Sequence, residues 1–176
     1  MPTCPPGKVD RESGCGSMRS NQTGKRRPSS SEGFLFSDSV IDPATLQAYL
    51  ETEYRVLGEL PFTLRVGQVS SDLLAMHKRQ RVDCSAFLTA CNPFSRSVDP
   101  PANHARQQSL ARDLTSRSMT FVDGVGQHPS NNWPGEESFL VLGLNLAAAK
   151  VLGERMEQNA IVWSGFDGAP QLILLR

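Results

Sequence analysis

The chain has 176 residues, and its 18 lysines and arginines balance its 18 aspartates and glutamates. This length suits one ordinary domain with its own core, and the charge balance argues against a global field that recruits nucleic acid or an anionic membrane. No apolar run approaches the ~20 residues of a membrane-spanning helix, and no apolar signal core opens the chain, so we expect a soluble, cytoplasmic protein.

The first 33 residues are rich in proline, glycine, serine and charge, and they lack apolar periodicity. Such a segment buries too little apolar surface to offset its ordering entropy, so residues 1–33 are predicted to be a disordered polar tail. Its basic cluster Lys25–Arg27 fits a solvated tail better than a nucleic-acid contact, and Met1 and Met18 are both candidate starts. Residues 34–176 are predicted to form a single globular domain.

Three elements are predicted between residues 42 and 80. Asp42 followed by proline is typical of a helix N-terminus, and three-and-four spacing of apolar residues continues that helix to about Val56. The alternation in Phe62–Val66 predicts a strand with one wet or ligand-facing side. Two serines then precede a second helix from Asp72 to about Gln80.

The stretch Ser85–Ser95 is the centre of the predicted fold. Its apolar part, Ser85–Cys91, has the length of a buried strand, and the following Asn-Pro step stops it. A helix is predicted over residues 102–116. Its apolar stripe, continued back toward the N-terminus, places Asn103 and Arg106 on the inward side. Inward polar groups at a helix start need hydrogen-bond partners.

A strand at Met119–Val122 is followed by Asp123–Gly135, which is predicted to be an irregular loop because it is rich in glycine and proline. Its glycines do not form a dinucleotide-binding fingerprint, because the third glycine and the following helix are missing. His128 has no partner at metal-ligand spacing and is predicted to lie on the surface.

The C-terminal third predicts an interior strand, a helix and a hairpin. Phe139–Gly143 is apolar on both faces, as interior strands are. Asn145 is a candidate cap for the next helix, and turn residues join Asn159–Trp163 to Gln171–Leu175.

Alternation of strands and helices predicts an α/β (or α+β) domain. We expect a mixed, mainly parallel sheet of about five to six strands flanked by about four helices. Ala86–Cys91 and Phe139–Leu142 are expected at its centre, with Phe62–Val66 nearer an edge.

Several blocks of the chain resemble a known family. They include LRVGQ at residues 64–68, FLTACNPFS at 87–95, Asn103 with Arg106, WPGEESFLVLG at 133–143 and QNAIVW at 158–163. In this order they resemble a bacterial family catalogued as domain of unknown function 3293, over about residues 46–176. The chain departs from the family pattern at Cys91, where an aromatic residue is usual, and at Ala102, where an acidic one is. The resemblance implies a fold-level grouping and no function.

A candidate site lies where the central strand meets the following helix. A helix N-terminus beside a strand end offers free backbone N–H groups and suits a small anionic or polar ligand. Arginine supplies a two-pronged donor and asparagine an orienting amide. The candidate ligand-binding residues are Arg65, Asn92, Ser95, Asn103, Arg106, Glu136 and Glu137. The alternative is that these groups form a satisfied network that only holds the loop.

Two other functions stay open. In an enzyme, Glu136 or Glu137 is the candidate acid/base, if burial raises its pKa. In an interaction protein, the basic tail or Phe34–Phe36 would dock a partner. No metal-ligand spacing or cofactor motif is present, so no metal and no cofactor are predicted, and the sequence does not define the oligomeric state.

Overall fold

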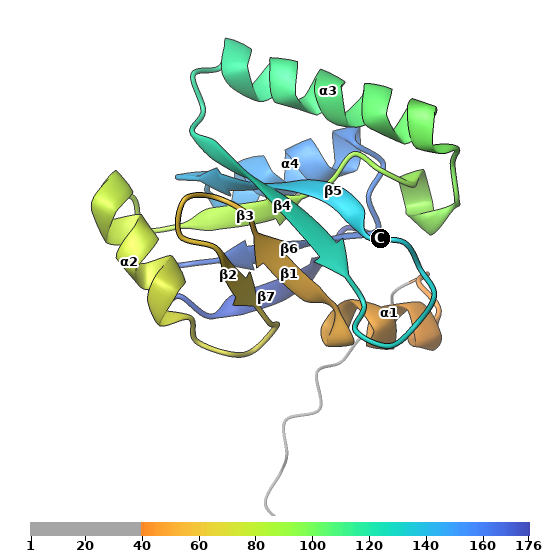
Figure 1. The fold of residues 1–176 in the computed structure, drawn as a ribbon, viewed down its shortest axis with the longest axis horizontal. Coiled ribbons are helices and arrows are strands. Elements are labelled where there is room, and N and C mark those ends of the chain that lie inside the picture. The colour runs from red at the N-terminus through yellow and green to blue at the C-terminus, as the bar shows by residue number, and fades with distance from the viewer. Residues whose placement is uncertain (1–39) are drawn as a thin grey trace, which may run out of the picture. The chain divides into compact units, whose positions relative to one another are not determined.

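The computed structural model describes residues 40–176, and every statement below concerns that part of the chain; the predicted tail and Phe34–Phe36 lie outside it. It contains four α-helices, a short 3₁₀ helix (η1) and seven strands (Figure 1). In chain order these are α1 (Pro43–Glu51), β1 (Glu53–Val56), β2 (Phe62–Leu64), α2 (Ser71–Gln80), β3 (Ser85–Leu88), η1 (Pro93–Ser95), α3 (Pro100–Ser116), β4 (Phe121–Gln127), β5 (Glu136–Leu142), α4 (Leu146–Arg155), β6 (Ala160–Ser164) and β7 (Pro170–Leu174).

The strands form one curled sheet in the order β2-β1-β4-β5-β3-β6-β7. Every neighbouring pair in it is antiparallel. The predicted mainly parallel sheet of five to six strands is therefore wrong. β3 and β5 do lie in the interior and β2 at an edge, as predicted.

The error has a geometric origin. Because β5 is antiparallel to both β4 and β3, these two strands point the same way, and α3 joins them. In the same way β3 lies between β5 and β6, which α4 joins. Each helical crossover thus links two strands that run in the same direction, as expected. These two strands are not neighbours, however, because a third strand lies between them and pairs antiparallel with both.

Two predicted boundaries are wrong: the C-terminal end of the first helix and the start of the loop after Val122. Residues 53–56 are strand β1, because α1 ends at Glu51 and its cap Thr52 is extended. Buried Tyr54 and Val56 then alternate with partly or fully exposed residues, a strand pattern that the helical reading obscured. The predicted irregular loop also begins too early, since Asp123–Gln127 continues β4 and pairs with both β1 and β5.

The predicted helix starts are confirmed at three caps. The side chains of Asp42, Ser70 and Asn145 each accept a hydrogen bond from a backbone N–H in the first turn of α1, α2 and α4.

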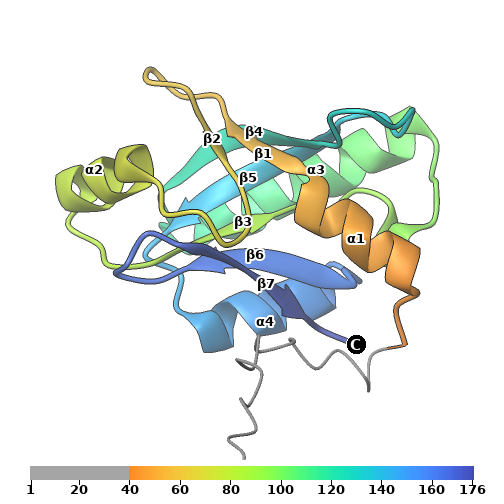
Figure 2. The same cartoon turned by 90° about the horizontal axis from the view of Figure 1, so that it is seen from below.

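The two faces of the sheet carry different helices. In Figure 2, α1 and α2 lie within the curl of the sheet, while α3 and α4 lie outside it. Leu110 and Leu114 of α3 and Leu152 of α4 pack on the outer face. Leu73 and Met76 of α2 pack on the inner face. Alternation along β5 directs Glu136, Ser138 and Leu140 to the inner face.

Backbone hydrogen bonds also bring the two ends of the sheet together. The N–H of Gly67, just after β2, donates to Pro170 O of β7 at 2.8 Å, and the N–H of Ser70 donates to Gly168 O at 3.0 Å. The connection from β2 to α2 thereby bridges the two edge strands. Among the described helices, none has both the length and the apolar character needed to cross a bilayer.

Candidate functional site

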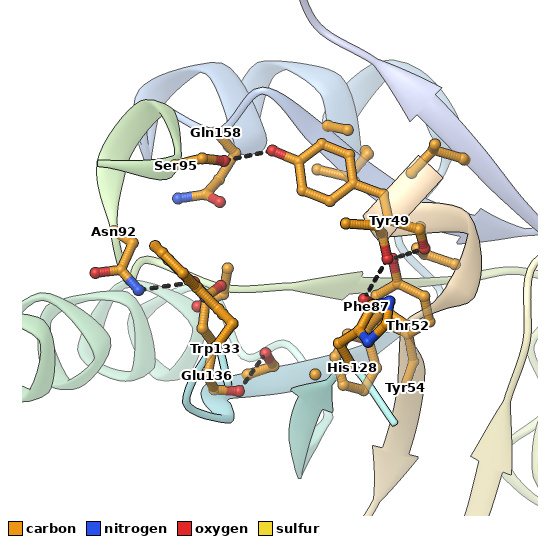
Figure 3. A pocket seen from close by; sticks show the side chains of 18 of the residues that line it. Tyr49, Thr52, Tyr54, Phe87, Asn92, Ser95, His128, Trp133, Glu136 and Gln158 are labelled. Atoms are coloured by element: carbon orange, nitrogen blue, oxygen red, sulfur yellow. Dashed lines mark hydrogen bonds between the residues drawn. The ribbon is translucent and has the colours of Figure 1, made fainter. Parts of the chain in front are cut away.

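A cavity of about 240 Å³ lies between α1 and the inner face of the sheet (Figure 3). We call it the α1 pocket. Its walls come from α1, from strands β1, β3, β4, β5, β6 and β7, and from the loops after β3 and β4. The lining residues are Thr45, Ala48, Tyr49, Thr52, Tyr54, Phe87, Thr89, Asn92, Ser95, Gly126, His128, Asn131, Trp133, Glu136, Ser138, Gln158, Ala160, Ile161, Val162 and Leu172.

Glu136, at the start of β5, is the one acidic residue of the described part of the chain that lines the pocket. Its Oε1 accepts hydrogen bonds from Asn92 Nδ2 at 2.7 Å and from Trp133 Nε1 at 2.9 Å. No hydrogen bond within the described residues is made to Oε2. Burial raises the pKa of Glu136 above its usual value, although these two hydrogen bonds partly oppose the shift. The pocket therefore holds a carboxyl group that keeps one oxygen available.

Asn92 is held in place by Asn103 of α3. The backbone N–H of Asn92 donates to Asn103 Oδ1 at 2.8 Å, and Asn103 Nδ2 donates back to Asn92 Oδ1 at 2.9 Å. Asn92, Phe94 and Ser95 all have positive φ, in the left-handed region that non-glycine residues seldom adopt. These contacts stabilise that turn, and the turn places Asn92 and Ser95 at the pocket wall.

A second polar group joins α1 to this turn and to β6. The hydroxyls of Tyr49 and Ser95 are hydrogen-bonded to each other. The amide of Asn159 donates to Tyr49 Oη at 3.2 Å and to Ser95 Oγ at 3.1 Å. Figure 3 shows the Tyr49 hydroxyl meeting Ser95 on one side of the pocket and Glu136 lying on another.

The loop after β4 closes another side of the pocket. His128 Nδ1 accepts the backbone N–H groups of Ser130 and Asn131, so a neutral ring carries its proton on Nε2. Nε2 lies 3.0 Å from Glu51 Oε2 and thereby joins the loop to α1. The His128 side chain is only 9% exposed. The prediction that it lies on the surface is wrong.

Aromatic rings supply much of the apolar wall. Tyr54 and Phe87 meet edge to face, with centroids 5.4 Å apart. The hydroxyl of Tyr54 donates to Tyr49 O at 2.8 Å, and burial raises the pKa of Tyr54 well above its usual range. This phenol therefore stays neutral in the folded protein.

Three predicted site residues, Asn92, Ser95 and Glu136, line the pocket. Asn103 positions Asn92 from behind. Arg106 lies outside the lining and donates to the backbone carbonyls of Ala90 at 2.7 Å and Met156 at 3.0 Å.

Two other predicted residues also lie outside the lining. Arg65 pairs with Glu53. The side chain of Glu137 is exposed, with Oε2 lying 3.3 Å from His104 Nδ1 of α3. Alternation along β5 separates it from Glu136.

Sequence reasoning missed Tyr49, Tyr54, Phe87 and His128 as lining residues. The available signal was the aromatic spacing around the end of α1, but the helix prediction ran through Tyr54 and placed it on the wrong element. Among residues 40–176, no group of three His, Cys, Asp or Glu side chains is placed to hold a metal ion.

Comparison with known proteins gives one match. The family model described as "Protein of unknown function (DUF3293)" matches residues 88–161, a narrower range than the resemblance in the sequence suggested. The matched segment includes Asn92, Asn103, Trp133, Glu136 and Gln158. No curated protein and no solved structure matches the chain. Residues 88–161, which are less than half of the chain, are thus similar to the DUF3293 family of proteins of unknown function.

Proposed function

We propose that the protein binds a small ligand in the α1 pocket. The observation that carries this proposal is the unbonded Oε2 of Glu136, in a cavity whose other walls combine aromatic and aliphatic side chains with neutral polar ones. Pockets that combine an apolar lining with a few convergent polar groups are typical binding sites.

The charges of the lining favour a polar ligand over an anionic one. Glu136 lines the pocket, whereas no lysine or arginine in the described part of the chain does. Arg65 and Arg106, which the sequence offered as anion-binding groups, pair with Glu53 and Glu157 outside it. An anion in the pocket would face a carboxylate without a compensating cation.

A fragment screen tests the proposal. Wild-type protein is screened by ligand-observed NMR and thermal shift against a library containing cationic, neutral and anionic compounds. Two variants are designed to fill the pocket, Ala48→Phe in α1 and Gly126→Val in β4. A Cβ at Gly126 would make ordinary van der Waals contacts, with its nearest neighbours at 3.9–4.0 Å, so the backbone there accepts a side chain without a clash.

We expect hits with wild-type protein that lose binding in both filled variants. A library without any hit, or hits that bind a folded filled variant as tightly as wild type, would contradict the proposal.

A second candidate function is acid/base catalysis by Glu136. It is favoured by the raised pKa of this carboxyl group, because such a shift allows proton transfer nearer neutral pH. The test is incubation of each screening hit with wild-type protein, with NMR to detect conversion. If Glu136 is the acid/base, conversion occurs, and Glu136→Gln abolishes it even at ligand concentrations that saturate the variant. Absence of conversion for every hit leaves binding as the function.

A further inference from the structure

The hydrogen-bond donors of the α1 pocket are largely engaged within the protein. Apart from the Tyr49–Ser95 pair, nine lining side chains donate to protein acceptors, including the amides of Asn92 and Gln158 and the indole of Trp133. The nine are Thr45, Thr52, Tyr54, Thr89, Asn92, His128 (through Nε2 of its neutral ring), Trp133, Ser138 and Gln158. The donors left over are neutral: the second hydrogen of the Asn92 amide, the Asn131 amide and one hydroxyl proton of the Tyr49–Ser95 pair.

The acceptors of the pocket are more available. Within residues 40–176, no donor reaches Glu136 Oε2 or Gln158 Oε1. The Nε2 of Gln158 donates to two backbone carbonyls, at 3.0 Å and 3.2 Å. The hydroxyl of Ser138 donates to Glu136 O at 3.0 Å and keeps lone pairs free. A ligand that supplies N–H groups would satisfy these acceptors, whereas an acceptor-rich ligand would leave them unpaired.

The walls suit a positive charge with an apolar body. The rings of Tyr49, Tyr54, Phe87 and Trp133 line the same cavity, and aromatic faces attract cations. His128 adds no charge in its neutral form, in which its Nδ1 accepts two backbone N–H groups. At about 240 Å³ the cavity is smaller than the roughly 300–1,000 Å³ of pockets for drug-sized ligands, which favours a single-ring compound.

We infer that the ligand of the α1 pocket is a small organic cation, an ammonium or amidinium on a single apolar ring, whose N–H groups donate to Glu136 Oε2. This inference rests on the proposed function and narrows it to one ligand class. It also accounts for the desolvated carboxyl group, because a cation beside Oε2 would favour the ionised form that burial disfavours.

Four probes of similar size and different charge test the inference: benzamidinium, benzylammonium, benzyl alcohol and benzoate. Their dissociation constants are measured by titration calorimetry. The indole N–H resonance of Trp133 reports whether each probe occupies the pocket. The proteins are wild type, Glu136→Gln, and Glu137→Gln as a matched control. Glu137 is the next residue in β5 and lies outside the lining.

We expect wild-type protein to bind the two cations at least about tenfold more tightly than benzyl alcohol, and benzoate most weakly, because a hydrogen bond to a charged group contributes about 1.5–3 kcal/mol. Glu136→Gln should lose at least about tenfold in cation affinity while its affinity for benzyl alcohol changes less than about threefold. Glu137→Gln should match wild type.

A further variant covers the case in which Glu136→Gln does not fold. Asn131→Lys places a positive charge on an exposed lining residue of the loop after β4, and it should weaken cation binding and strengthen benzoate binding. Benzoate binding as tightly as the cations, or cation binding that is unchanged in folded Glu136→Gln or Asn131→Lys, would overturn the inference. Absence of binding by all four probes would also overturn it. The library screen tests ligand binding independently of ligand charge. If its hits are neutral or anionic, the proposed function is supported and the inference of a cationic ligand is rejected.

Discussion

The helices α1 and α2 cover the inner face of the same sheet, but only α2 fills the space beneath it. Leu73 and Met76 of α2 are 0% and 6% exposed and pack on the sheet core. Leu46 is the only buried residue of α1, and the neighbouring Ala48 and Tyr49 line a cavity instead. We call the part of the inner face on which Leu73 and Met76 pack the α2 end, and the part that lines the α1 pocket the α1 end.

Strand β5 shows how one element supplies both regions. On its inner face, Leu140 and Leu142 belong to the core that α2 covers, whereas Glu136 and Ser138 line the α1 pocket. A strand can therefore change from core to site along one face, where its side chains become small or polar.

Leu73→Ala should strongly destabilise the α2 end. Truncation of a fully buried leucine costs about 2–5 kcal/mol of unfolding free energy, because it removes packing contacts and leaves a cavity. Urea unfolding measures the loss. Leu50→Ala, at a 37% exposed position of α1, is the control and should cost less than about 0.5 kcal/mol. Equal losses in the two variants would contradict the comparison.

Gly124 and Gly126 of β4 form a matched pair, with Gly124 against the core residue Phe87 and Gly126 beside the α1 pocket. A Cβ at Gly124 would lie 2.6 Å from Phe87 Cε2 and 2.9 Å from Arg55 O, so Gly124→Ala should destabilise by about 1–3 kcal/mol. Gly126→Ala, beside the open pocket, should change the unfolding free energy by less than about 1 kcal/mol. Thermal unfolding of both variants gives the difference, and a Gly126→Ala loss as large as that of Gly124→Ala would show that the pocket is not open.

Glu136→Gln should change the pH dependence of stability at the α1 end. Because burial raises the folded-state pKa of Glu136 above 4.5, the folded state binds its proton more strongly than the unfolded state does. The unfolding free energy of wild type therefore falls as pH rises from about 4.5 through the folded-state pKa. The glutamine variant lacks this fall and should gain stability relative to wild type between pH 4 and pH 8. Parallel stability curves for the two proteins would contradict the assigned burial.

His77 of α2 should make the unfolding free energy change with pH in the opposite direction. Burial lowers its pKa from 6.5, although nearby Asp83 opposes the shift. Its Nε2 lies 2.8 Å from Ser85 Oγ, while Nδ1 is buried and has no hydrogen-bond partner among residues 40–176. The unfolded state then binds more protons, so wild type loses stability as pH falls below about 6.5 towards the folded-state pKa. His77→Gln should lack this loss, and an unchanged acid slope of the unfolding free energy would contradict it.

The sequence predicted local structure better than sheet order. Capping residues such as Asp42 and Ser70 act within one turn, so their positions identify helix starts without tertiary information. The insertion of β5 between β3 and β4 depends on contacts across the sheet, which one sequence does not display. Glycines at 124 and 126 suggested a loop, yet they lie in β4, where Gly124 gives room to the Phe87 ring.

The candidate site was predicted in part for the same reason. The turn at Asn92 and the inward stripe of α3 are local patterns, and they located Asn103 correctly beside Asn92. The opposite wall of the pocket comes from α1 and β1, which are remote in sequence from that turn. Periodicity along one helix does not indicate which distant aromatic side chains will face it.

The bridge between the ends of the sheet has a consequence for self-association. An edge strand with free backbone groups is a template on which another chain can add a strand. Here the backbone N–H groups of Gly67 and Ser70 already donate hydrogen bonds to Pro170 O at the start of β7 and to Gly168 O in the turn before it. An incoming strand would have to displace the protein's own backbone there, so this part of β7 is protected against intermolecular β-pairing.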